Sequence, residues 1–255
     1  MTRVLALIAF IGFIVSVACF AGAAALGGRD IVEHGWTIPA DWHIGVDDHD
    51  GDGDRDWDEA ADGSGPDTTR EIAWDGSTGL DLDVPAEVQF TQGSGPAKLT
   101  INGPKGSVDH LVLEGGRLKF DQPMHRTHRL VIVMTAPNVS HFQLDGDDRL
   151  TIAGFHQPRL AIDISGSAEA VAQGQATDFD LQISGSGMAD LSKLASDTGK
   201  VDIAGSGRAT IAPKSTADVD ISGSGEVTLL SRPANVHSNV SGSGKLIQGG
   251  PGAST

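Results

Sequence analysis

The stretch Asp218-Val-Asp-Ile-Ser-Gly-Ser-Gly-Glu-Val-Thr-Leu229 decides the fold. Apolar and polar residues alternate on both sides of its Ser-Gly-Ser-Gly tetrad, which is the period of a strand with one buried face. The tetrad suits a turn, because glycine tolerates positive φ and serine hydroxyls can satisfy turn backbone groups. The stretch therefore predicts a unit of strand, glycine turn and strand.

This unit is repeated through the C-terminal half of the chain. The tetrad occurs five times, with its first glycines 19, 20, 18 and 19 residues apart, and one further unit with the same apolar spacing precedes them. The predicted turn glycines are Gly146, Gly166, Gly185, Gly205, Gly223 and Gly242. Strand-only units too short to bury their own apolar face bury a continuous one when stacked. The sequence therefore predicts an all-β fold, a parallel β-helix (solenoid) with rungs of 18–20 residues.

The region from Thr68 to Asn138 also alternates like strands, but with looser spacing. We expect it to form the first rungs or a capping sheet. Solenoid ends need such covering, because an exposed strand edge invites pairing with another edge.

The run from Leu144 to Ile152, followed by units such as Asp220 to Gly225, resembles the bacterial family called putative auto-transporter adhesin, head GIN domain. The resemblance extends over about residues 70 to 248. It implies a right-handed parallel β-helix on a cell-envelope protein. The family is a domain of unknown function, so the resemblance implies no catalytic residue.

The N-terminus predicts export. Residues Val4 to Leu26 contain no charged side chain, and about 20 apolar residues suffice to span a bilayer. An uncleaved membrane anchor, a cleaved secretory signal and a lipoprotein signal acylated at Cys19 all stay open. Arg3 precedes the segment and the acidic remainder follows it, so the β-helix is expected to face away from the cytoplasm. The membrane is thus a predicted partner, and the bacterial envelope is the predicted location, either periplasmic or at the surface.

An acidic segment follows. Residues 47–67 carry ten acidic side chains and one arginine, which is −9 of the chain's net charge of −16. Such a run is typical of a solvated spacer. It also contains the ligand spacing of an EF-hand calcium loop, although no amphipathic helices flank it. The candidate Ca²⁺ ligands are Asp48, Asp50, Asp52, Asp56 and Glu59.

The predicted organisation is a signal or anchor helix at 1–29, an acidic linker at 30–67, the β-helix at 68–249 and a tail at 250–255. No intramolecular disulfide is possible, because Cys19 is the only cysteine. Stability must then come from the stacked core.

The sequence offers little for catalysis. Asp163, Asp202 and Asp220 are expected in one outward column that Gln182 interrupts, which fits a hydrated polar face better than a catalytic cleft. There is no Gly-x-Ser-x-Gly nucleophile motif, and the acidic balance argues against nucleic acid as a partner. No catalytic or cofactor-binding residue is predicted.

The sequence favours a non-enzymatic exported envelope protein whose β-helix presents a polar surface for binding or adhesion. Two alternatives stay open. One is a β-helix polysaccharide lyase or hydrolase that uses the outward carboxylates. The other is a calcium-responsive tether that orders through the aspartate-rich segment.

Overall fold

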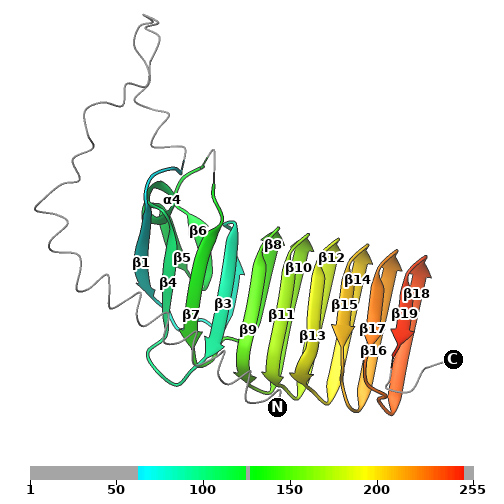
Figure 1. Cartoon of the computed structure of the whole chain (residues 1–255). Coiled ribbons are helices and arrows are strands. Elements are labelled where there is room, and N and C mark those ends of the chain that lie inside the picture. The colour runs from blue at the N-terminus through cyan, green and yellow to red at the C-terminus, as the bar shows by residue number, and fades with distance from the viewer. Residues whose placement is uncertain (1–62, 125–126, 250–255) are drawn as a thin grey trace, which may run out of the picture. The chain divides into compact units, whose positions relative to one another are not determined.

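The computed structural model describes residues 63–124 and 127–249, which form a β-solenoid built from two sheets (Figure 1). The predicted apolar helix, most of the acidic linker, all five candidate Ca²⁺ ligands and the tail lie outside the described residues.

The first sheet, sheet A, has ten strands. In spatial order they are β1 (Asp67–Ala73), β4 (Lys98–Pro104), β7 (Leu130–Ala136), β3 (Ala86–Gln92), β9 (Arg149–His156), β11 (Glu169–Gln175), β13 (Met188–Ala195), β15 (Arg208–Ile211), β17 (Glu226–Leu229) and β19 (Lys245–Gln248).

The second sheet, sheet B, has nine strands. In spatial order they are β18 (Asn235–Gly242), β16 (Thr216–Gly223), β14 (Thr198–Gly205), β12 (Asp178–Gly185), β10 (Arg159–Gly166), β8 (His141–Gly146), β2 (Gly79–Leu82), β6 (Arg117–Phe120) and β5 (Leu111–Glu114). One short helix, α4 (Lys105–Asp109), completes the described elements.

The repeated half is a regular stack. Each unit from β8/β9 to β18/β19 contributes one strand to each sheet, and the five steps between the six units make about five turns. Neighbouring strands are parallel, and the register joins equivalent repeat positions, as in Ile164 with Ile183 and Gly166 with Gly185. The solenoid and the columns predicted from the repeat are confirmed.

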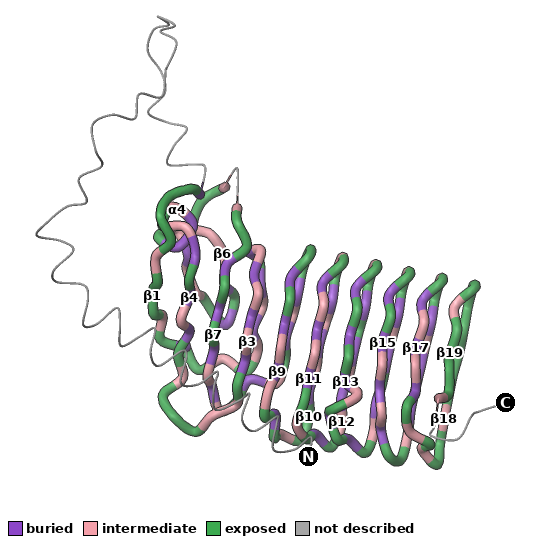
Figure 2. Tube along the Cα trace, viewed as in Figure 1, coloured by how far each residue is buried: buried purple, intermediate pink, exposed green. Residues whose placement is uncertain are grey.

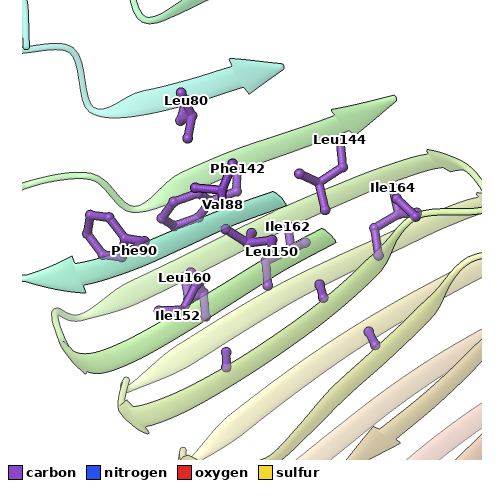
Figure 3. Packing of buried hydrophobic residues seen from close by; sticks show 14 of the residues in the cluster. Leu80, Val88, Phe90, Phe142, Leu144, Leu150, Ile152, Leu160, Ile162 and Ile164 are labelled. Atoms are coloured by element: carbon purple, nitrogen blue, oxygen red, sulfur yellow. The ribbon is translucent and has the colours of Figure 1, made fainter. Parts of the chain in front are cut away.

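The core fills the space between the two sheets. Buried and more exposed residues alternate along the strands (Figure 2), as the two-residue period requires. At the wider N-terminal end, Phe90 and Phe142 meet edge to face with ring centroids 5.1 Å apart (Figure 3). Nearly all inward positions from Leu80 to Leu229 are less than 5% exposed, so the units share one continuous apolar core.

The first rungs do not follow chain order. Strands β2 and β3 lie between β6/β7 and β8/β9, so the chain leaves after β3, builds the end of the solenoid, and returns across it. β3 pairs in parallel with both β7 and β9. The region after Thr68 therefore supplies both things that the sequence left open, two rungs and a cap.

The cap uses antiparallel pairing. β4 pairs antiparallel with β1 and β7, and β5 pairs antiparallel with β6. Arg70 on the edge strand β1 donates from Nη1 to the carbonyl oxygens of Val108 (3.1 Å) and Leu111 (3.0 Å). These bonds tie the edge strand to the segment around α4, which covers that end of the core.

The turn glycines form a column. All six have positive φ, from 85° at Gly146 to 125° at Gly205. A Cβ added to Gly166, Gly185, Gly205, Gly223 or Gly242 would lie 2.4 to 2.7 Å from the carbonyl oxygen of the equivalent glycine in the preceding unit. At these five positions both the φ angle and the close approach of the backbones require glycine, whereas at Gly146 only the φ angle does.

Asp148 replaces the last tetrad residue in the first unit of the stack. Its side chain is 1% exposed, and Oδ1 accepts a hydrogen bond from the backbone N–H of Ala86 at 2.8 Å. The bond joins β8/β9 to the inserted rung β2/β3. Burial raises the pKa of Asp148 to about 6, and the hydrogen bond from Ala86 only partly offsets that effect.

This shift makes a prediction for pH. Between pH 3.8 and about 6 the folded chain holds a proton on Asp148 that the unfolded chain has released, so stability falls as pH rises through this window. Asp148→Asn keeps the acceptor but cannot ionise. Between pH 4 and 7 its free energy of unfolding should gain about 2–3 kcal/mol relative to wild type. Urea unfolding across this range measures the difference, and parallel pH profiles for the two proteins would contradict it.

Candidate binding groove on sheet B

A groove of about 640 Å³ crosses the outer face of sheet B from β8 to β18. Two columns of outward side chains line it. The first, which we call the acid-amide column, consists of Gln143, Asp163, Gln182, Asp202, Asp220 and Asn239. We call the second the hydroxyl column after its four serines. It consists of Asp145, Ser165, Ser184, Ala204, Ser222 and Ser241.

Strand pairing sets the spacing in both columns. Residues that are register partners lie on strands about 4.8 Å apart, so the columns run along the solenoid axis. Asp202 and Asp220 are direct partners, whereas Asp163 is separated from Asp202 by the strand that carries Gln182. The groove thus repeats carboxylate, amide and hydroxyl groups at a nearly fixed interval.

A histidine and a lysine from the adjacent column lie against the acid-amide column. His141 Nε2 lies 2.9 Å from Asp163, and Lys200 Nζ donates to Asp202 at 2.5 Å. The hydrogen bond to Asp202 raises the pKa of Lys200, so the lysine stays charged. Within residues 63–124 and 127–249, Asp220 has no basic side chain at ion-pair distance.

The acid-amide column continues beyond the groove onto β2 and β6. Asp81 is the register partner of Gln143 and of Arg117, whose Nε lies 3.4 Å from an Asp81 carboxylate oxygen. Burial raises the pKa of Asp81, and Arg117 partly opposes the shift. Arg117 also lies 3.2 Å from Asp83, so one arginine serves two carboxylates at this upstream end.

The structure brings together the three carboxylates that the sequence placed in one column, with Gln182 between them. Sequence reasoning missed the contribution of His141 and Lys200. The signal was present, because Lys200 is two residues before Asp202 and so lies on the same face of its strand.

Other kinds of site find no support in the described part of the chain. Residues 63–124 and 127–249 contain no group of three or more histidine, cysteine or acidic side chains placed to hold a metal ion. None of the helices within those residues is both long and apolar enough to cross a membrane.

The groove is suited to hydrogen bonding and charge pairing along a line. Its half-exposed carboxylates can accept from cationic groups, and its amides and hydroxyls can both donate and accept. A shallow surface of this shape fits an extended polymer better than a small enclosed ligand.

Comparison with solved structures shows the same fold elsewhere. An adhesin, described as putative, from Bacteroides fragilis aligns with a TM-score of 0.60 and 17% identity, over 72% of this chain and 98% of that one. A second such adhesin, from Parabacteroides distasonis, aligns with a TM-score of 0.53 and 14% identity, over 73% and 98%. No curated protein sequence matches this chain.

A family match extends through most of the solenoid. Residues 78–233 match the family described as "Putative auto-transporter adhesin, head GIN domain". They contain the inserted rung, the cap apart from its edge strand β1, and all units except the last. With more than half of its sequence matched, the chain belongs to this family.

Proposed function

We propose that this protein is a non-enzymatic binding module of the bacterial cell envelope, and that the groove on sheet B holds an extended, positively charged macromolecule. The observation that carries the proposal is the groove itself, a line of regularly spaced carboxylate, amide and hydroxyl groups on a rigid solenoid. Rigid presentation lowers the ordering cost of binding. Membership in a family described as adhesin-like agrees with a surface-binding role.

The placement in the envelope is part of the same proposal. Export through the apolar N-terminal segment, retained or cleaved, would present the solenoid outside the cytoplasm. We also infer right-handed winding, since connections between parallel strands of one sheet are right-handed in nearly all proteins.

The groove charge gives a direct test. The triple variant Asp163→Asn, Asp202→Asn, Asp220→Asn should bind a hexalysine probe about tenfold more weakly than wild type at low salt, because three half-exposed charge contacts are lost. Fluorescence anisotropy of the labelled probe measures the dissociation constant. Wild-type binding should also weaken as salt is added.

A matched control separates the groove from general acidity. Glu71, Glu114 and Asp121 lie on the cap, are 48–68% exposed, and carry the same three charges. Replacing them with Gln, Gln and Asn should change hexalysine binding by less than about twofold. Equal losses in the two triple variants would show that net charge, rather than the groove, attracts the probe.

A polysaccharide lyase or hydrolase is the second candidate. The observation in its favour is that Asp202 and Asp220 face the same groove from adjacent strands, at a spacing near the 5–5.5 Å of retaining glycosidases. Asp202→Asn alone would then abolish release of reducing ends from acidic and neutral polysaccharides. Under the binding proposal the wild-type protein releases none.

A further inference from the structure

A second column of side chains, on the outer face of sheet A, carries a different pattern of charge. Its members are register partners on β3, β9, β11, β13, β15, β17 and β19 (Figure 1). We call it the charge column, and it consists of Glu87, Arg149, Glu169, Met188, Arg208, Glu226 and Lys245.

The signs along this column are negative, positive, negative, neutral, positive, negative, positive. Pairing between neighbouring strands explains the alternation, since Arg149 lies 3.1 Å from Glu169 and Arg208 lies 3.5 Å from Glu226. Strand pairing does not explain the centre of the column, where a charged residue is replaced by Met188, which is 45% exposed. Beyond Met188 the signs are the opposite of those that strict alternation would give. Because of that inversion, the column has opposite charges at equal distances on either side of Met188.

This antisymmetry is what a two-fold axis requires. If a second copy faces sheet A about an axis parallel to the strands through Met188, the order of its strands is reversed. Glu169 then faces Arg208 of the second copy, Arg149 faces Glu226, and Glu87 faces Lys245. Each pair occurs twice, and the two methionines meet on the axis.

We propose that two copies of this chain associate face to face through sheet A, with the two-fold axis at Met188. A strictly alternating column would not do this, because a charged residue at the central position would place like charges opposite each other at every position. The inverted centre makes these three pairs attractive instead of repulsive, which is six contacts because each pair occurs twice.

The neighbouring column on the same face is compatible with this packing. It consists of Gln89, Thr151, Val171, Asp190, Thr210, Thr228 and Ile247, and most of these side chains are short or uncharged. The two-fold axis brings Asp190 close to Asp190 of the second copy. Its Oδ1 accepts a hydrogen bond from the Ser192 N–H at 2.9 Å, and this contact at the axis is the one like-charge pair in the two columns.

The face is of modest size. Seven strands about 4.8 Å apart, with two outward columns, cover roughly 500 Å² per copy, or about 1,000 Å² in total. This is the lower limit for a specific interface, so the dimer should be reversible and sensitive to salt. It leaves both sheet B grooves exposed on opposite sides, which would make the dimer bivalent.

Substitutions at Met188 test the axis. Met188→Lys and Met188→Glu each place like charges opposite each other in a homodimer, whereas a mixture of the two variants places Lys opposite Glu. Within one chain both substitutions stand between Glu169 and Arg208, so each gains one attractive and one repulsive neighbour. The pair is therefore matched, and the position is exposed.

Sedimentation equilibrium of the full chain in density-matched detergent provides the measurement. Wild type should form a dimer at about 50 mM salt that weakens at least about tenfold at about 500 mM. Each variant alone should associate about tenfold more weakly than wild type, and the equimolar mixture should recover the dimer. Asn235→Lys, which adds a charge on exposed β18 of sheet B outside the groove, should dimerise as wild type does.

Three outcomes would overturn the proposal. The first is a wild-type chain that is monomeric at both salt concentrations. The second is a dimer that neither Met188 variant weakens, which would place the contact elsewhere, such as at the apolar N-terminal segment. The third is a mixture of the two variants that associates no better than either alone.

Discussion

Replacing Gly205 with alanine is expected to destabilise the solenoid by about 4 kcal/mol. Gly205 has φ of 125°, a conformation that residues with a Cβ rarely adopt. An added Cβ would lie 2.5 Å from the carbonyl oxygen of Gly185, and that oxygen already accepts the Ser206 N–H at 2.8 Å. The methyl group must therefore displace a hydrogen-bonded backbone in the middle of the stack.

Denaturant unfolding measures this loss, and two serine variants serve as controls. Ser206→Ala changes an exposed side chain in the same turn. Ser222→Ala reproduces what Ala204 already shows at the equivalent position of the preceding unit. Both should stay within about 0.5 kcal/mol of wild type. A Gly205→Ala protein as stable as these controls would mean that the turn can take another conformation.

Gly207→Ala is expected to cost about 3 kcal/mol for a different reason. A Cβ on Gly207 would lie 2.6 Å from Cγ2 of Ile183 in the preceding unit and 3.1 Å from the carbonyl oxygen of Gly187. The same contact recurs along the stack, because Gly187, Gly225 and Gly244 each face the Cγ2 of an isoleucine one unit upstream. The conflict is thus with a β-branched side chain.

Two natural exceptions show what relieves this conflict. Ala168 and Asp148 occupy the same tetrad position and carry a Cβ, and both are buried. In the preceding units the residues equivalent to the isoleucine are Leu144 and Leu82, which are unbranched at Cβ. A Cβ is therefore tolerated where the upstream partner lacks Cγ2.

Ile183→Leu should accordingly rescue Gly207→Ala. The leucine alone should cost about 1 kcal/mol, but the double variant should be more stable than the sum of the two changes by about 1–2 kcal/mol. Ile183→Val keeps Cγ2 and should give no rescue. A double-mutant cycle by urea unfolding decides between these results, and equal coupling for leucine and valine would exclude Cγ2 as the cause.

These glycines also bear on binding. The turn column holds the ends of the sheet B strands at the spacing of adjacent backbones, so it positions the acid-amide and hydroxyl columns beside it. A variant that opens this stack should weaken hexalysine binding together with stability. The groove triple variant, by contrast, changes only half-exposed side chains on the outer face of sheet B and should lose binding alone.

Much of the regular half of the solenoid could be predicted from the sequence. The two-residue alternation around each tetrad determines which side chains face inward, and the nearly constant step between glycines determines which ones pair, as Ile203 does with Ile221. In this half the local pattern of residues also determines the strand register, because each unit contacts mainly the next unit in the chain. The outward column of Asp163, Asp202 and Asp220 followed from the same rule.

The tertiary structure alone decided what depends on contacts between distant segments. One example is the insertion of β2/β3 between β6/β7 and β8/β9. Another is the burial of Asp148 against Ala86, which lies 62 positions away and belongs to no repeat unit. Most of the charge column follows from the repeat, but only the fold places Glu87 opposite Arg149 and so completes the antisymmetry about Met188. In a periodic sequence the local spacing determines which neighbouring units pair, whereas the order of the rungs at the end of the solenoid depends on packing between segments that are far apart in the sequence.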